Sequence, residues 1–598
     1  MDFEFPKEFD VIIVGTGVIE SILSAAASRV GKRVLHIDEN EYYGGQWASF
    51  NLEAIMKLKN SQKERIANKS DSNFLSFGND LFNIKNIDYK FHVLPKKNKV
   101  CSEEKDKEVV DNNLQEVSQD DNEETWDEEL LIKTSRKFNI DLCPKLQYAR
   151  GNFVELLISS NIARYSEYRS VTRILTWLNN HLEPLPCSRS DVFANTRVSV
   201  VEKRMLMKLL TSLNDEEKET QNYESKTFKE FLTDKKLTSN LVHYVLYGIS
   251  TSSDHTQCKE GIQKAKRFLN SLGRFGKTPF LFSMYGSGEI PQAFCRLSAV
   301  FGGIFALGQP IEGFALNDEK FKSLTVRSQT IKAEHLVMGI ENLPKQFIKS
   351  KKHDYISRCI LITNKSVLDC EKEQLTLIFY PPENNKSFTT IIELGYLTGT
   401  CPNNVYLVHL IAKQDTSPQE DFKHIIDKLF INSYHEMAEN NHDKPHILWS
   451  YYCSINDSND VELTEDLPKN IFVCPGPDLD LDYDFSVTKA KKIFNAMYPD
   501  LEFLPRAPDP EEIIIGDDEI TEEAKEITEE AKEITEEAKE ITEEAKEITE
   551  EAKEITKEMT EEAKEITEEA EETTENEIND VKNEKQETIS EERQHTVE

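Results

Sequence analysis

The stretch that decides the fold is FDVIIVGTGVIESILSAAASRVGKRVLHID, residues 9–38. Its first apolar run, FDVIIV, suits a short strand that is buried on both faces. GTG then marks a tight turn, and the apolar residues that follow recur at helical spacing. A second apolar run, VLHI, ends at Asp38. This strand–helix–strand unit predicts an α/β protein that opens with a Rossmann-type sheet.

The turn in this unit lacks two features that hold a dinucleotide. Gly15 and Gly17 are present, but Glu20 stands where a third glycine is expected. Its carboxylate falls in the first turn of the helix, where the positive helix end should hold a pyrophosphate. Gln46 stands where flavoproteins often carry an arginine. We therefore interpret Gly15, Gly17 and Glu20 as a vestigial dinucleotide turn and expect no cofactor.

Negative charge is concentrated in two segments. The 598 residues carry a formal net charge of −36. Residues 511–598 hold 36 acidic and 10 basic side chains, and residues 101–130 hold 13 acidic and 2 basic ones. The rest of the chain is close to neutral, so it has no basic surplus to neutralise phosphates. We expect no nucleic-acid partner.

The sequence shows no signal for a membrane, for secretion or for lipidation. No apolar run approaches the roughly 18–20 residues of a membrane span. The chain starts with the acidic MDFEFPKEFD, which is unlike a signal peptide. It ends in HTVE, which has no prenylation cysteine. We expect a cytosolic protein that has no lipid anchor of its own.

Catalytic and metal motifs are also missing from the sequence. The ten cysteines stand singly, which favours reduced thiols over a zinc site. No G-x-S-x-G, H-E-x-x-H or P-loop pattern occurs. His36, inside the second predicted strand, is more typical of a core residue than of a base. We expect no catalytic residue and no metal ligand.

Composition and periodicity divide the chain into five parts. They are a discontinuous sheet domain (1–95, 131–188 and 273–504), an acidic insertion (96–130), a helical domain (189–272), a proline-rich linker (505–518) and an acidic heptad-repeat tail (519–598). The tail repeats EITEEAK, and its Ile/Ala stripe is able to pair two helices. Its charge and the small size of alanine favour a solvated single helix or a partly disordered segment.

Two long segments carry a resemblance to a known family. GTGVIESILSAAASRVGKRVLHIDENEYYGG (15–45) and GRFGKTPFLFSMYGSGEIPQAFCRLSAVFGGIFAL (273–307) closely resemble the Rab GDP-dissociation inhibitor and Rab escort protein superfamily. The resemblance covers residues 8–516. It implies a flavoprotein-like sheet domain without flavin, a smaller all-helical domain and no enzyme activity. It also implies a surface that binds GDP-bound Rab GTPases.

The resemblance nominates a Rab-binding platform. The matching positions are Tyr43, Arg274, Glu289, Gln292 and Arg296. Glu289 and Arg296 are seven residues apart, so they share one face of a helix. They either contact opposite charges on the GTPase, or pair with each other or cap local backbone. Ile304 and Ala306 stand where the inhibitors carry Thr and Met, which is a departure at the platform's edge.

The helical domain favours the escort branch of the superfamily. Escort proteins dock onto the α-subunit of Rab geranylgeranyltransferase through a Phe and an Arg, which match Phe193 and Arg204. Without the resemblance, Phe193 is more simply a core residue between two helices. The acidic insertion and the length past 500 residues also resemble escort proteins. The alternatives are an inhibitor without transferase recruitment and a flavin-dependent oxidoreductase.

The expected role is therefore to present GDP-bound Rab to the transferase and to escort the prenylated Rab to membranes. A geranylgeranyl chain at about 0.8 kcal/mol per buried CH₂ needs an apolar groove. Candidate lining residues come from apolar positions of the helical domain. They are Leu206, Leu209, Leu210, Leu241, Val245 and Leu246, most of which also suit a plain core.

Overall fold

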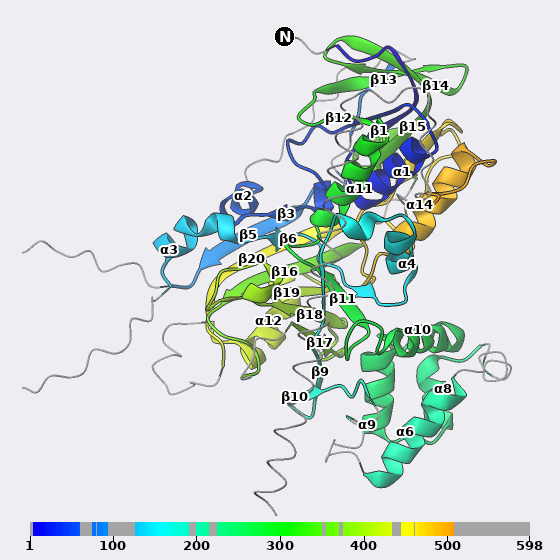
Figure 1. Ribbon diagram of the computed structural model, residues 1–598. Helices are drawn as coiled ribbons and strands as arrows, with labels where there is room; N and C mark the ends of the chain where they lie inside the picture. Colours follow the sequence, from blue (N-terminus) through cyan, green and yellow to red (C-terminus); the bar gives the residue numbers. More distant parts are fainter. Residues whose placement is uncertain are drawn as a thin grey trace, which may run out of the picture. The chain divides into compact units, whose positions relative to one another are not determined.

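The computed structural model describes most of the chain up to residue 506 (Figure 1). The described residues are 4–59, 74–78, 81–93, 126–188, 191, 199–213, 223, 225–349, 354–369, 375–432, 444–459 and 461–506. Residues Met1–Ala507 form one compact unit. The heptad-repeat tail, most of the linker and Phe193 lie outside the described residues.

The predicted strand–helix–strand opening is confirmed. Strand β1 (Glu8–Val14) is followed by helix α1 (Val18–Arg29) and strand β2 (Val34–Ile37). β1 lies between two parallel neighbours at the centre of an eight-stranded sheet. The order is β12 (Ile304–Ala306), β2, β1, β15 (Gln329–Gly339), β14 (Lys320–Val326), β13 (Ile311–Asn317) and β4 (Phe74–Leu75), with β21 (Ile471–Cys474) parallel to β15.

One face of this sheet packs against helices. α1 contacts α11 (Glu289–Val300) and α14 (Asp484–Met497), and α14 contacts α4 (Asn152–Ser159). Small residues let α1 and α11 approach closely, since the Ser298 hydroxyl lies 2.9 Å from that of Ser24 and 2.7 Å from that of Ser28. This packing fixes α11 against the sheet, and α11 carries three of the predicted platform residues.

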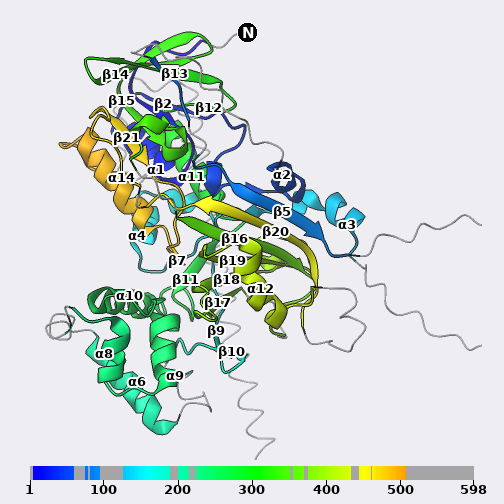
Figure 2. The same ribbon diagram turned by 180° about the vertical axis from the view of Figure 1, so that it is seen from behind.

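The structure contains a second eight-stranded sheet, whereas the sequence predicted one sheet domain without dividing it. Its order is β10 (His181–Pro184), β9 (Arg173–Leu178), β17 (Thr376–Tyr380), β18 (Thr389–Leu394), β19 (Tyr406–Lys413), β16 (Tyr355–Thr363), β20 (Ile447–Asn456) and β5 (Lys85–Phe91). Eight of the nine residues of β16 are buried, because apolar clusters cover both faces. Helix α12 (Pro418–Leu429) contributes to one of them (Figure 2).

Smaller elements complete the sheet region. Two short sheets join β7 (Gln147–Tyr148), β11 (Phe280–Ser283) and β8 (Tyr168–Ser170), and β3 (Ser49–Phe50) with β6 (Ile140–Asp141). The short helices are η1 (Gly45–Trp47), α2 (Leu52–Lys57), η2 (Ser135–Lys137), η3 (Ile162–Arg164), η5 (Ile340–Asn342), η6 (Lys345–Phe347) and η7 (Tyr396–Thr398).

The helical region forms a separate group of elements (Figures 1 and 2). It comprises α6 (Val200–Ser212), α8 (Phe228–Asp234), α9 (Ser239–His243), the π-helix η4 (Tyr244–Ile249) and α10 (Cys258–Ser271). Ser199 and Glu202 form a capping box that starts α6. The candidate lipid-lining residues pack in or against the apolar core here, with Leu210 partly buried and the other five buried.

The acidic insertion ends earlier than predicted. Residues 126–130 belong to the folded unit, because helix α3 (Glu128–Lys133) begins inside the predicted insertion. The Asp127 carboxylate accepts a hydrogen bond from the Leu130 amide at 2.8 Å and so caps this helix. Trp126 packs against the apolar core. The prediction was wrong at this boundary because the acidic residues that cap and begin α3 resemble the solvated run before them.

Candidate functional site

The dinucleotide turn is held by the chain's own side chains. Gly15 has a φ of 96°, the left-handed conformation that favours glycine. The Asp38 carboxylate accepts hydrogen bonds from the Thr16 amide at 2.9 Å and the Thr16 hydroxyl at 2.7 Å. It also accepts bonds from the amide and side chain of Asn40. In a dinucleotide site the carboxylate at this position would bind a ribose. Here the Asp38 carboxylate is instead bound by Thr16 and Asn40 of the same chain.

Carboxyl groups occupy the position where a pyrophosphate would lie. The Glu20 side chain folds back over Gly17, and that of Glu341 lies beside Gly15. Burial, together with the charges of Glu341 and Asp38, raises the pKa of Glu20 well above its ordinary value. The Gln46 amide donates to the Phe82 carbonyl at 2.6 Å. These residues do not fit a flavin dinucleotide, which needs space and positive charge here.

We expect Glu20→Gln to stabilise the protein increasingly as the pH rises. A carboxyl whose pKa is raised in the folded protein holds a proton that the unfolded chain releases above pH ~4.3. Its contribution to stability is therefore present at low pH and lost as the pH rises toward the folded pKa. Glutamine does not titrate, so its advantage should grow by up to about 1.4 kcal/mol per pH unit.

Urea unfolding of both proteins at pH 5, 6 and 7 measures this difference. Glu53→Gln, at an exposed position in the first turn of α2, is the matched control and should show no such trend. A constant difference between Glu20→Gln and the parent across these pH values would contradict the buried, protonated state of Glu20.

Four of the five predicted platform residues meet at one cavity. Glu289, Gln292 and Arg296 lie along one side of α11, and Tyr43 comes from the loop after β2. The cavity has a volume of 330 Å³. We call it the platform pocket, and it is lined by Tyr43, Tyr165, Glu289, Gln292, Ala293, Cys295, Arg296, Ala299 and Phe305. The i, i+3, i+7 spacing on one helix explains why the three α11 residues share it.

The charges of the platform pocket do not neutralise each other. Arg296 is exposed, and its guanidinium lies 5.5 Å from the centre of the Tyr165 ring. Neither Glu289 nor Arg296 has an ion pair within the described part of the chain. Burial and the nearby charge of Asp141 raise the pKa of Glu289. Both signs of charge therefore lie on one side of α11, and the alternative of an internal Glu289–Arg296 pair is not observed among the described residues.

Three predicted site residues lie elsewhere or outside the described residues. Arg274 does not line the platform pocket, since it donates to the Ala149 carbonyl at 2.6 Å and pairs with Glu155 of α4. Arg204 is exposed on α6, and nothing is described of Phe193.

Sequence reasoning missed two aromatic residues of the pocket, Tyr165 and Phe305. Phe305 lies on strand β12 between Ile304 and Ala306, the two positions where the sequence departs from the inhibitors. The alternation of side chains along a strand is the signal that could have pointed to it. Tyr165 has no such local signal, because it meets α11 only through the tertiary fold.

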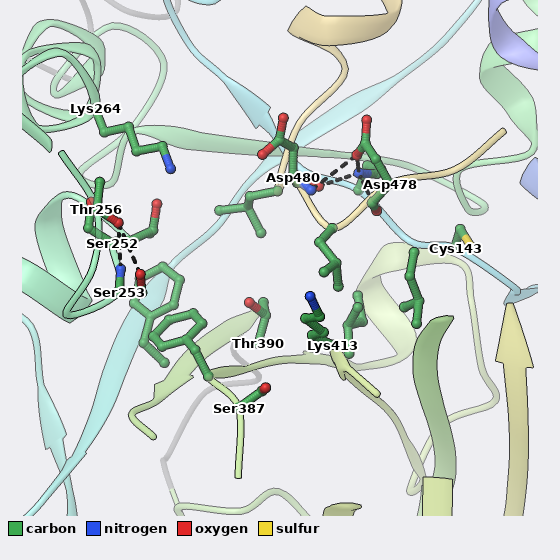
Figure 3. Close-up of a pocket in the computed structure, with 18 of the residues that line it drawn as sticks. Cys143, Ser252, Ser253, Thr256, Lys264, Ser387, Thr390, Lys413, Asp478 and Asp480 are labelled. Carbon is green, nitrogen blue, oxygen red and sulfur yellow. Dashed lines mark hydrogen bonds and ion pairs between the residues drawn. The ribbon is translucent and has the colours of Figure 1, made fainter. Parts of the chain in front are cut away.

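A further cavity of 430 Å³ lies between α10, the second sheet and residues 478–481 (Figure 3). Its basic groups are largely neutralised, with Lys145 paired to Asp478 and Arg267 paired to Asp482 beside it. Burial raises the pKa of the Cys143 thiol to about 11. No histidine is among the described residues that line it, so its Ser and Thr hydroxyls have no imidazole base. The geometry does not assemble an activated nucleophile.

The eight cysteines in the described ranges are all buried and free. No group of three His, Cys, Asp or Glu side chains in those ranges could hold a metal ion. None of the described helices has the length and apolar character needed to cross a membrane.

The fold is similar to that of a Rab GDP-dissociation inhibitor of known structure. A family described as "GDP dissociation inhibitor" matches residues 5–81. A crystal structure of a Rab GDI from Plasmodium falciparum aligns with a TM-score of 0.57 at 19% identity, covering 83% of this chain and 100% of that one. The likeness at this identity shows the fold alone, a mixed α/β fold with large sheets.

Within this class, sequence relatives define the branch. A family described as "RAE1/2 domain I, C-terminal region" matches residues 356–479. The human Rab proteins geranylgeranyltransferase component A 1 is 34% identical, covering 87% of this chain and 95% of its own length. The Drosophila melanogaster component A is also 34% identical, covering 86% and 93%. The chain belongs to the family of Rab geranylgeranyltransferase component A proteins, which confirms the predicted resemblance.

Proposed function

We propose that this protein is a Rab escort protein, a non-catalytic component of Rab geranylgeranyltransferase. It binds GDP-bound Rab GTPases and presents them to the transferase, which attaches geranylgeranyl groups to cysteines at the Rab C-terminus. It then accompanies the prenylated Rab to membranes. The observation that carries the proposal is the similarity to the human and fly component A proteins along nearly their whole length.

The geometry of the platform pocket supports the binding step. Glu289 and Arg296 carry opposite charges on one helix face, and neither is neutralised by an ion pair in the described ranges. Such a pair fixes the register of a partner and speeds association more than it raises affinity. Tyr43 and Gln292 add an aromatic ring and an amide beside them. The GTPase switch regions in their GDP-bound arrangement would supply the complementary groups.

The second candidate is a GDP-dissociation inhibitor without transferase recruitment. An Arabidopsis thaliana guanosine nucleotide diphosphate dissociation inhibitor is 25% identical, covering 81% of this chain and 99% of its own length. The fold is shared, so the fold cannot separate the two functions. Recruitment of the transferase is the property that distinguishes them.

Reconstituted prenylation tests the proposal. Purified Rab-GDP, Rab geranylgeranyltransferase and a labelled geranylgeranyl donor are mixed with and without this protein. Label transfer that depends on the protein supports the escort function. Rab-GDP binding without label transfer would favour the inhibitor function, and the absence of both would contradict the Rab assignment.

We expect a chain that lacks residues 519–598 to support prenylation in the same assay at the same rate. The described residues that line the platform pocket, and those of α6, all precede residue 519. Initial rates of label transfer at equal protein concentration measure this. A rate reduced several-fold would show that the tail takes part in the reaction.

A further inference from the structure

Tyr165 enters the platform pocket from outside helix α11. It follows η3, at the end of the turn that leads out of α4. Its side chain is half-buried and packs against the apolar cluster to which α1, α4, α11 and α14 contribute. The centre of its ring lies 5.5 Å from the guanidinium carbon of Arg296. This distance is within the range of a cation–π contact, so the ring connects the exposed arginine with the core.

No carboxylate holds the Arg296 guanidinium within the described part of the chain, where it has neither an ion pair nor a hydrogen bond. Other arginines of the folded unit are held differently, since Arg267 pairs with Asp482 and Arg274 pairs with Glu155. A carboxylate partner fixes a guanidinium but also neutralises its charge. An aromatic face restrains the guanidinium and leaves the charge available to a partner.

The turn that carries Tyr165 is fixed to the core. Asn161 adopts a left-handed conformation, with a φ of 63°, between α4 and η3. The Arg29 side chain of α1 donates a hydrogen bond to the Ser160 carbonyl at 2.9 Å, and Ile162 is buried. The Tyr165 amide donates to the Ile162 carbonyl at 2.8 Å. The ring therefore has a defined place, which a residue that orients another side chain requires.

We infer that Tyr165 is a positioning residue for the Rab contact, because its ring holds the Arg296 guanidinium where it meets an acidic group of the GTPase. The inference rests on the proposed function, since the GTPase supplies the anionic partner. An unrestrained arginine side chain samples many rotamers, and only some of them place the guanidinium at the platform pocket. The apparent affinity falls with the fraction of molecules in the competent rotamer. Tyr165 raises that fraction.

A double-mutant cycle separates positioning from general packing. We expect Tyr165→Leu, which keeps an apolar side chain but removes the ring, to lower the affinity for Rab-GDP about fivefold in calorimetric titration. Tyr165→Phe keeps the ring and should stay within about twofold of the parent. In an Arg296→Ala background, Tyr165→Leu should have no further effect, because no guanidinium is left to orient.

Tyr355→Leu is the matched control. The Tyr355 ring centre lies 5.2 Å from the Lys85 ammonium, and neither residue lines the platform pocket. This variant loses a comparable cation–π contact and should bind Rab-GDP like the parent. Thermal unfolding of the two Tyr165 variants checks that both remain folded.

A Tyr165→Leu variant that binds like the parent would overturn the inference, and so would equal weakening with and without the Arg296 side chain. A Tyr165→Phe variant as weak as Tyr165→Leu would overturn it too, since the ring face would then not be the feature that matters. If Arg296→Ala alone binds like the parent, the inference fails while the proposed function stands. If the parent protein itself does not bind Rab-GDP, the proposed function fails.

Discussion

Replacing Arg296 by glutamate should lower the affinity for a GDP-bound Rab GTPase by about a hundredfold. Arg296 is exposed on α11 at the platform pocket and has no ion pair among the described residues, so its charge is available to a partner. Reversing the charge removes an attraction and adds a repulsion at a contact that is desolvated on binding. Such changes cost about 3 kcal/mol, which corresponds to roughly a hundredfold in affinity.

Calorimetric titration of Rab-GDP into the variant measures the effect. Lys320→Glu is a suitable control, because Lys320 is exposed at the start of β14 and does not line the platform pocket. It makes the same change of net charge and should leave the affinity within about twofold. An Arg296→Glu variant that binds like the parent would remove Arg296 from the Rab contact.

We expect Phe193→Ala to abolish recruitment of the transferase while leaving Rab-GDP binding intact. The expectation comes from the resemblance to escort proteins, in which an aromatic residue and an arginine dock onto the transferase α-subunit. Truncating a buried aromatic anchor at an interface typically costs 2–4 kcal/mol, and prenylation needs the complete complex. Pull-down with the α-subunit and calorimetry with Rab-GDP measure the two interactions separately.

Leu501→Ala is the control for loss of an exposed apolar side chain, because Leu501 is 36% exposed near the end of the described chain. It should leave both interactions unchanged. Unchanged recruitment in Phe193→Ala would assign Phe193 to packing, as the sequence alone suggested. Loss of both interactions would instead indicate a disturbed fold. Arg204→Ala would then test the same interface, because Arg204 is an exposed residue of α6.

Local pattern was enough to predict the strand–helix–strand unit that opens the first sheet. β1, α1 and β2 follow from a run of apolar residues, a glycine turn and a helical repeat that lie within 30 residues of one another.

The second sheet could not be predicted in the same way. β16 pairs with β19 and β20, and β9 pairs with β17, so its register depends on segments that are distant in the sequence. The buried strands are nearly continuous apolar runs, which carry no alternation to show which face they present. Only the tertiary fold decides these pairings.

The candidate site was predictable where one helix carries it. Glu289, Gln292 and Arg296 share a face of α11 because of their spacing, and the resemblance added Tyr43 to them. Tyr165 comes from the end of η3, and no periodicity connects it with α11.

The turn whose donors bind the Asp38 carboxylate has a consequence for the stability of the folded protein. Thr16 and Asn40 donate hydrogen bonds to its carboxylate. Because both residues belong to the same chain, these donors are present at every concentration of cofactor. In a flavoprotein, bound cofactor stabilises the folded state by mass action, and the folded fraction follows the vitamin supply. Here the loop is ordered by hydrogen bonds within the chain, so its order does not depend on the concentration of a ligand at Asp38.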